Sequence, residues 1–289
     1  MNGASVGYRE RKPLTRFAAF ASATWEQRVP DDRPRYSQLC LPTGGAELVW
    51  RSGTVPVLVG PRTGPVTDVL DPGTRVFGLR LRPGATESLF GVPGTELVDE
   101  VVPLGVALGS AYRRVARALD AVTCVSDAQR RLAEALEDRP RVDPVIAQLV
   151  QGLGPGGLPV VGPLARELFV SERHLRRRCR TATGLGPKTL QRVLRFQGFV
   201  ALVQAVIAAG ASPAAAGMAR LAAEAGYADQ AHLARECQRL SGHGPLQYVT
   251  RAERHCGEHD HSAAFEAILP VRRVTGVGRS VQGVGQHPA

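Results

Sequence analysis

A short pattern that occurs twice constrains the fold of this chain more than any other feature. In the later copy, Leu233, Cys237 and Leu240 recur at i, i+4 and i+7, which predicts a helix with one packed face. Gly226 precedes this helix, at a position suited to a left-handed residue that ends a helix. Asp229 stands where the following helix would be capped. A short helix, a glycine turn and a second, capped helix are typical of a helix-turn-helix unit.

The earlier copy begins at Leu164, about 58 residues before the later one, and repeats both the apolar register and the cap. Ser171 is the expected cap, while Leu175 and Cys179 lie on the packed face. One such pattern is weak evidence, because glycine turns between short helices are common. Two copies that agree in register and in cap predict a domain with two helix-turn-helix units.

The segment from about Pro144 to Arg251 resembles the DNA-binding domain of AraC/XylS-type transcription regulators. That family carries two helix-turn-helix units joined by one long helix, and a Gly-aromatic-x-Asp-Gln-x-His-Leu run followed by Arg marks its second unit. The match in the second unit and in the closing Gly-x-x-Pro-x-x-Tyr piece comprises Gly226, Tyr227, Asp229, Gln230, His232, Leu233, Arg235, Gly242, Pro245 and Tyr248. The match in the first unit comprises Ser171, Leu175, Arg177, Gly184 and Pro187.

Two departures from the family pattern concern the packed faces of the recognition helices. Cys179 and Cys237 each stand where the family usually has Phe. Both are small and apolar, so neighbouring side chains are expected to fill the space.

The exposed sides of the two recognition helices carry the candidate DNA contacts. Four arginines, at i, i+3, i+4 and i+7, lie opposite the packed face of the first helix: Arg173, Arg176, Arg177 and Arg180. The resemblance implies that base edges are reached from Arg173, Arg176 and Arg177, and in the second unit from Gln230, Ala231, His232 and Arg235. We predict phosphate contacts for Arg178, Lys188, Arg192 and Arg239. Gln230 and Arg235 have a second interpretation, in which they hold the helix in place.

A run of helix formers joins the two units. It starts at Pro187 and extends to about Ala208, which predicts one helix of roughly 21 residues and about 32 Å. That length is close to one turn of B-DNA, so both recognition helices could enter successive major grooves. The connection from Ala211 to Gly217 is expected to be longer and looser than the family's usual one.

The basic charge of the chain is concentrated in the same segment. The net charge is +10, and residues 141 to 255 hold 15 Lys and Arg against 7 Asp and Glu. The usual explanation of an arginine run is a solvated surface with interleaved acidic residues, but the stretch from Arg176 to Arg180 has none. This distribution is typical of a protein that binds the phosphate backbone of nucleic acid.

The first part of the chain predicts a small β-sandwich or open barrel. Glycine and proline turns separate short β-branched or alternating runs, at Leu48–Trp50, Val55–Val59, Val66–Leu70 and Val76–Leu81. Residues 35 to 105 are similar to an N-terminal domain of some actinobacterial-type AraC regulators, a resemblance that brings no established ligand. The fold class is therefore α+β, with a β-rich regulatory or sensor domain before an all-α DNA-binding domain.

Helical periodicity follows the strands, from Leu104 to about residue 137. These helices either pack on the barrel, the commoner outcome for amphipathic helices, or build a dimer. We place the N-terminal domain at residues 1–140, the DNA-binding domain at 141–255 and a flexible tail at 256–289.

Other features bear on compartment. Five scattered cysteines suit reduced thiols better than a disulfide framework, and the charged N-terminus is no signal peptide. We expect no membrane-spanning stretch and a cytoplasmic protein.

The expected partner is double-stranded DNA, and RNA polymerase, a small-molecule effector and a second copy of the chain are further candidates. A metal-dependent cupin enzyme is disfavoured, because no histidine precedes His174. We expect no enzyme activity, no cofactor and no metal; the alternative is an enzyme with a non-metal β-barrel and a basic adaptor domain. The cluster from His255 to His261 either binds a metal or, as we expect, belongs to a polar tail.

Overall fold

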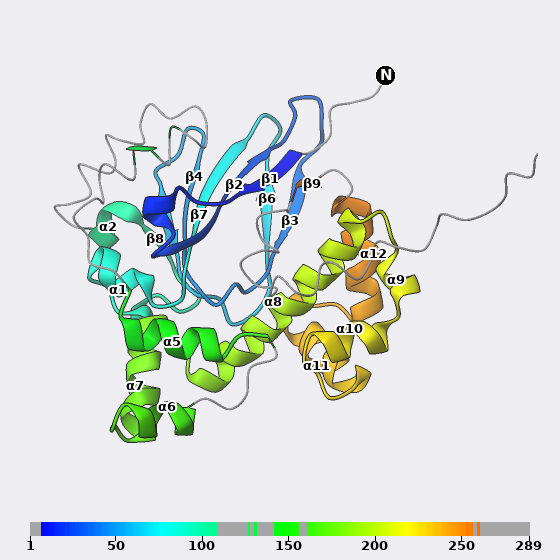
Figure 1. Cartoon of the computed structure of the whole chain (residues 1–289). Coiled ribbons are helices and arrows are strands. Elements are labelled where there is room, and N and C mark those ends of the chain that lie inside the picture. The colour runs from blue at the N-terminus through cyan, green and yellow to red at the C-terminus, as the bar shows by residue number, and fades with distance from the viewer. Residues whose placement is uncertain are drawn as a thin grey trace, which may run out of the picture.

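The computed structural model describes residues 7–108, 127, 130, 131, 142–155, 161–256 and 259–260. It contains a β-rich N-terminal part and a helical C-terminal part, which confirms the predicted fold class (Figure 1). The long helix α8 runs diagonally between the two groups of C-terminal helices, below the strands in Figure 1.

The N-terminal part contains two sheets. The larger has the strand order β8-β5-β4-β7-β2-β1-β9, and its neighbouring strands are antiparallel except that β9 runs parallel to β1. Its strands are β1 (Gly7–Arg11), β2 (Ala21–Arg28), β4 (Glu47–Arg51), β5 (Val57–Val59), β7 (Arg75–Leu81), β8 (Val101–Pro103) and β9 (His259–Asp260). The smaller sheet pairs β3 (Tyr36–Cys40) with β6 (Val66–Leu70).

The predicted runs correspond to β4, β5, β6 and β7, whereas the sequence did not reveal β1, β2, β3, β8 and β9, the last of which lies in the expected tail. The reason lies in what these strands face. β2 has the sequence ASATWEQR and β3 has YSQLC, so neither shows the β-branched alternation that marks a strand. Trp25 and Gln27 of β2 and all of β3 line a cavity with both apolar and polar walls, which explains their mixed composition.

One side of the larger sheet packs on short helices. Helix α1 (Ala85–Phe90) follows Gly84, whose φ of +87° suits glycine, and buries Ala85 and Leu89 completely. The core of this part also contains Leu48, Leu58 and Leu79. Helix α2 (Leu104–Leu108) buries Leu104, and the rest of the predicted helical region up to residue 137 lies almost wholly outside the described residues.

The C-terminal part is helical throughout its described residues and consists of α5 (Pro144–Gly152), α6 (Val161–Glu167), α7 (Glu172–Thr183), α8 (Pro187–Ala208), α9 (Pro213–Ala216), α10 (Met218–Glu224), α11 (Gln230–Ser241) and α12 (Pro245–Cys256). Helix α8 has the predicted bounds and 22 residues, close to the roughly 21 expected, and its Phe196 and Phe199 are completely buried. The Tyr248 ring of α12 packs on both, with centroid distances of 6.1 and 6.0 Å. One aromatic cluster therefore joins α8 to the second unit.

Helix α8 is also long and apolar enough, by length and composition, to cross a membrane, contrary to our expectation that no such stretch exists. Its most apolar window is 61% buried inside the protein. The high hydropathy of α8 is explained by its place in the fold, because this helix supplies much of the core between the two units.

The connection after α8 is more ordered than expected. Within it α9 forms a short helix, Pro213 is buried, and the Ser212 hydroxyl donates to Glu253 of α12 at 2.7 Å. Proline at the first helical position and this contact with α12 hold the segment in place.

The two parts touch at several places, which include Gly44 against Leu190 of α8 and Gly84 against Ile146 of α5. The Gln197 side chain of α8 donates to the carbonyl oxygen of Pro42 at 2.6 Å. Gly184, which ends α7, lies against Gly94 of a 3₁₀ turn (Gly94–Glu96) so closely that a Cβ atom at Gly184 would lie 2.6 Å from the Gly94 oxygen. Both helix-turn-helix units are thus connected to the β-rich part, one directly and one through α8.

Candidate nucleic-acid interface and cavity

The first unit consists of α6, a tight turn and α7. The Ser171 hydroxyl accepts a hydrogen bond from the backbone N–H of His174 at 3.2 Å, which caps α7 as predicted. Leu175 and Cys179 form the packed face, and at most 1% of the surface of either residue is exposed. The opposite side of α7 faces solvent and is free to meet a partner.

The second unit repeats this construction with α10 and α11. The Asp229 carboxylate accepts from the backbone N–H of His232 at 2.6 Å, and Gly226 has a φ of +81°. Leu233, Cys237 and Leu240 form the packed face and are buried. The predicted caps and packed faces of both units are therefore confirmed.

The two cysteines that replace Phe are packed by the same arrangement in each unit. The hydroxyls of Thr183 and Ser241 lie 3.9 and 3.6 Å from Cys179 Sγ and Cys237 Sγ and donate to the carbonyl oxygens of the same cysteines. Burial raises the pKa of both thiols to about 11. Each cysteine is therefore a protonated core residue at neutral pH.

Most of the predicted contact residues are exposed on the free sides of the two units: Arg173, Arg176, Arg177, Arg180, Lys188, Gln230, Ala231, Arg235 and Arg239. Arg176 forms an exposed pair with Glu172 at 2.8 Å, and Arg177 lies 3.4 Å from His174 Nδ1. His232 is half-buried, with its ring edge-on to Tyr227 at 5.2 Å.

Two arginines predicted to meet phosphate have partners inside the protein. Arg178 binds Asp143, the residue that caps α5, with nitrogen–oxygen distances of 2.8 and 2.6 Å. Arg192 of α8 makes a bidentate pair with the buried Glu236 of α11, at 2.8 and 2.6 Å. Both guanidinium groups therefore hold helices together within the protein. The predicted phosphate contacts of Arg178 and Arg192 stay predictions.

Comparison with known proteins agrees with this geometry. Residues 164–251 match a family described as a helix-turn-helix domain. These residues are an AraC-type helix-turn-helix domain. The protein is accordingly a DNA-binding transcription regulator, as the doubled units predicted.

The β-rich part and the whole chain also have matches. Residues 9–103 match a family described as a domain of unknown function, DUF6597. A crystal structure of ToxT from Vibrio cholerae O395 is similar with a TM-score of 0.39 and 9% identity, covering 78% of this chain and 95% of ToxT. A crystal structure of ToxT from Vibrio cholerae strain SCE256 with a bound unsaturated fatty acid is similar with a TM-score of 0.36 and 10% identity. The similarity covers 85% of this chain and 94% of that ToxT chain. No curated protein sequence matches this chain.

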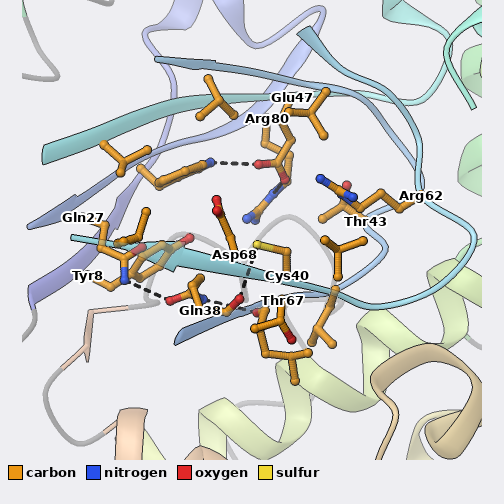
Figure 2. Close-up of a pocket in the computed structure, with 18 of the residues that line it drawn as sticks. Tyr8, Gln27, Gln38, Cys40, Thr43, Glu47, Arg62, Thr67, Asp68 and Arg80 are labelled. Atoms are coloured by element: carbon orange, nitrogen blue, oxygen red, sulfur yellow. Dashed lines mark hydrogen bonds and ion pairs between the residues drawn. The ribbon is translucent and has the colours of Figure 1, made fainter. Parts of the chain in front are cut away.

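A cavity of about 740 Å³ lies where the β-rich part meets the AraC-type domain. Both sheets contribute to its lining, and α8 and α12 close it with side chains that include Gln197, Val200, Gln204, Tyr248 and Arg251. In Figure 2, Cys40, Asp68, Arg62 and Arg80 point toward its centre. Sequence reasoning missed this site, because its residues come from each of the strands β1 to β8 and from α8 and α12, with no shared motif.

Ion pairs account for the acidic groups of the cavity. Arg80 binds Glu10 at 2.5 Å and Glu47 at 2.9 Å, while Arg51 pairs with Asp68. Burial alone would lower the pKa of Arg80, but the two carboxylates raise it well above its usual value. Burial, helped by Glu47 and Asp68, raises the pKa of the Cys40 thiol to about 11. Two arginines of the lining, Arg62 and Arg251, have no acidic partner among the described residues.

The pair between Arg192 and Glu236 generates a prediction about stability. Replacing Glu236 with Gln leaves a half-buried guanidinium without its counter-charge, so the free energy of unfolding should fall by roughly 2 to 3 kcal/mol. The matched control is Glu172→Gln in the exposed pair with Arg176, which should cost less than about 0.5 kcal/mol. Urea unfolding measures both, and equal losses would show that Arg192 and Glu236 do not join α8 to α11.

Proposed function

We propose that this regulator reads two half-sites on one face of duplex DNA, with α7 and α11 in successive major grooves. The observation that carries this proposal is the position of α8, whose 22 residues span about 33 Å, close to one turn of B-DNA. Side chains cap both recognition helices, and the residues of their amino-terminal turns are mostly exposed, which leaves these turns available to base edges.

The contact residues divide into two kinds in this proposal. Arg173, Arg176 and Arg177 of α7 and Gln230, Ala231, His232 and Arg235 of α11 meet base edges. Arg180, Lys188 and Arg239 meet phosphate, because each is exposed and has no acidic partner among the described residues. His232 is less free to move than the arginines of the first group, since its ring already packs on Tyr227.

The cavity supports a further part of the proposal, the binding of a small organic effector. It is large enough for such a molecule, and it combines aromatic rings with polar groups, as ligand sites do. Arg62 of the β-rich part and Arg251 of α12 are the lining charges that lack a counter-ion among the described residues. A ligand with one anionic group would balance one of these two positive charges, and a ligand that fills the cavity would touch both parts of the chain.

The remaining elements of the proposal concern organisation and location. The domain boundaries at residues 140 and 255, a cytoplasmic location, contact with RNA polymerase and pairing with a second copy stay predictions. They agree with a regulator whose effector cavity is walled by helices of its own DNA-binding domain.

The division of contacts can be tested with two arginines of one helix. Replacing Arg177 with Ala should cost about 1 to 3 kcal/mol on the preferred duplex and relax the choice of base at one position. Replacing Arg180 with Ala should weaken binding to every duplex about equally and lower the salt slope by about one. Competition binding against a randomised duplex pool measures both effects. A base-preference change with Arg180→Ala and none with Arg177→Ala would contradict the assignment.

The effector site can be tested with probes that differ only in charge. Aliphatic and aromatic monocarboxylates should raise the thermal midpoint of the full chain, whereas their primary amides should not, because only the acids supply an anion. The shift should shrink with Arg62→Gln and persist with Arg16→Gln, an exposed arginine outside the cavity. An equal shift from acids and amides would contradict the charge argument.

A further inference from the structure

Phe169, in the turn between α6 and α7, has an unusual backbone conformation and an unusual exposure. Its φ is +53°, and among the described residues only Asp99 is another non-glycine residue with positive φ. A side chain with a Cβ atom is strained in this left-handed region. The Phe169 side chain is also 97% exposed, so packing inside the protein does not offset the strain.

The second unit shows what this turn requires. Gly226 occupies the same place there, with a φ of +81°. The two turns close with equivalent backbone hydrogen bonds, from Phe169 N to Arg166 O (3.1 Å) and Val170 N to Ala165 O (3.0 Å), and from Gly226 N to Ala223 O (3.0 Å) and Tyr227 N to Ala222 O (2.9 Å). Glycine is therefore the unstrained solution for the turn, and Phe169 is not needed to form it.

The position of Phe169 indicates what its ring could touch. It lies two residues before Ser171, the cap of α7, and α7 carries exposed Arg173 and Arg177 in its first turns. In helix-turn-helix proteins this end of the recognition helix enters the major groove. The apolar groups of DNA near that point are the thymine methyl, which packs on apolar side chains including Phe, and the deoxyribose of the groove wall.

We propose that Phe169 is a DNA-contacting residue of the first half-site, whose ring packs on a thymine methyl or on the deoxyribose beside it. The inference rests on the proposed insertion of α7 into the major groove. Strained residues that the fold does not require are typical of binding sites, where the partner supplies the compensating contact. A protein partner is the competing occupant, but the basic surroundings on α7 favour DNA.

The test is Phe169→Gly in the full chain, which removes the ring and relieves the strain together. Its thermal midpoint should rise by about 2 °C or more, because the turn is easier for glycine. Its affinity for the duplex that the wild type selects should fall roughly tenfold, the loss expected for one buried apolar contact. Val106→Ala, at a 74% exposed position on α2, is the control and should change neither quantity.

Replacing each thymine of the duplex with uracil separates the two DNA groups. If the methyl is the contact, one such replacement weakens the wild type and leaves Phe169→Gly unchanged. If the deoxyribose is the contact, Phe169→Gly binds every such duplex more weakly than the wild type does, by the same factor.

Other outcomes would overturn the inference. If Phe169→Gly binds the duplex with wild-type affinity, the ring does not meet DNA. If this variant also shows reduced transcription in a reconstituted reaction, the ring contacts a protein instead. A wild-type protein that binds no duplex in a salt-dependent manner would contradict the proposed function itself.

Discussion

The buried face of α8 is the contact on which the rest of the structure depends. Phe196 and Phe199 are completely buried, and α8 packs on helices of both helix-turn-helix units. The bidentate pair from Arg192 to Glu236 adds a directional contact to α11, so the second recognition helix cannot rotate about α8 without breaking it. The relative placement of the two DNA-reading surfaces is thus a property of one helix.

The same helix connects the cavity to the DNA-binding surface. Gln197, Val200 and Gln204 of α8 face the cavity, while other residues of α8 pack on the recognition helices. A ligand that pushes on α8 or α12 therefore acts on elements that position α11. Gly184 provides a second connection, because the end of α7 lies directly on the β-rich part at Gly94.

The sequence predicted local features well and distant pairings poorly. The caps at Ser171 and Asp229 depend on hydrogen bonds that reach only three residues along the chain, so their residue types are visible in the sequence. The partner of Arg192 lies 44 residues away and that of Arg178 lies 35 away, in contacts that only the packed fold creates. The cavity was missed because segments far apart in the chain form it. Strand β2 was missed because its residues that face the cavity do not follow the alternation of an ordinary strand.

The central claim, that α8 holds two recognition helices at one fixed separation, is tested most directly by varying the spacing between half-sites. Binding of the full chain would be measured on duplexes in which one to ten base pairs are inserted between the two half-sites that the wild type protects. A fixed separation of the recognition helices predicts a single preferred spacing, with a steep loss of affinity for an insertion of about five base pairs, which turns the half-sites to opposite faces of the DNA. Affinity that is independent of spacing would contradict it, because the two units would then move independently or only one would bind.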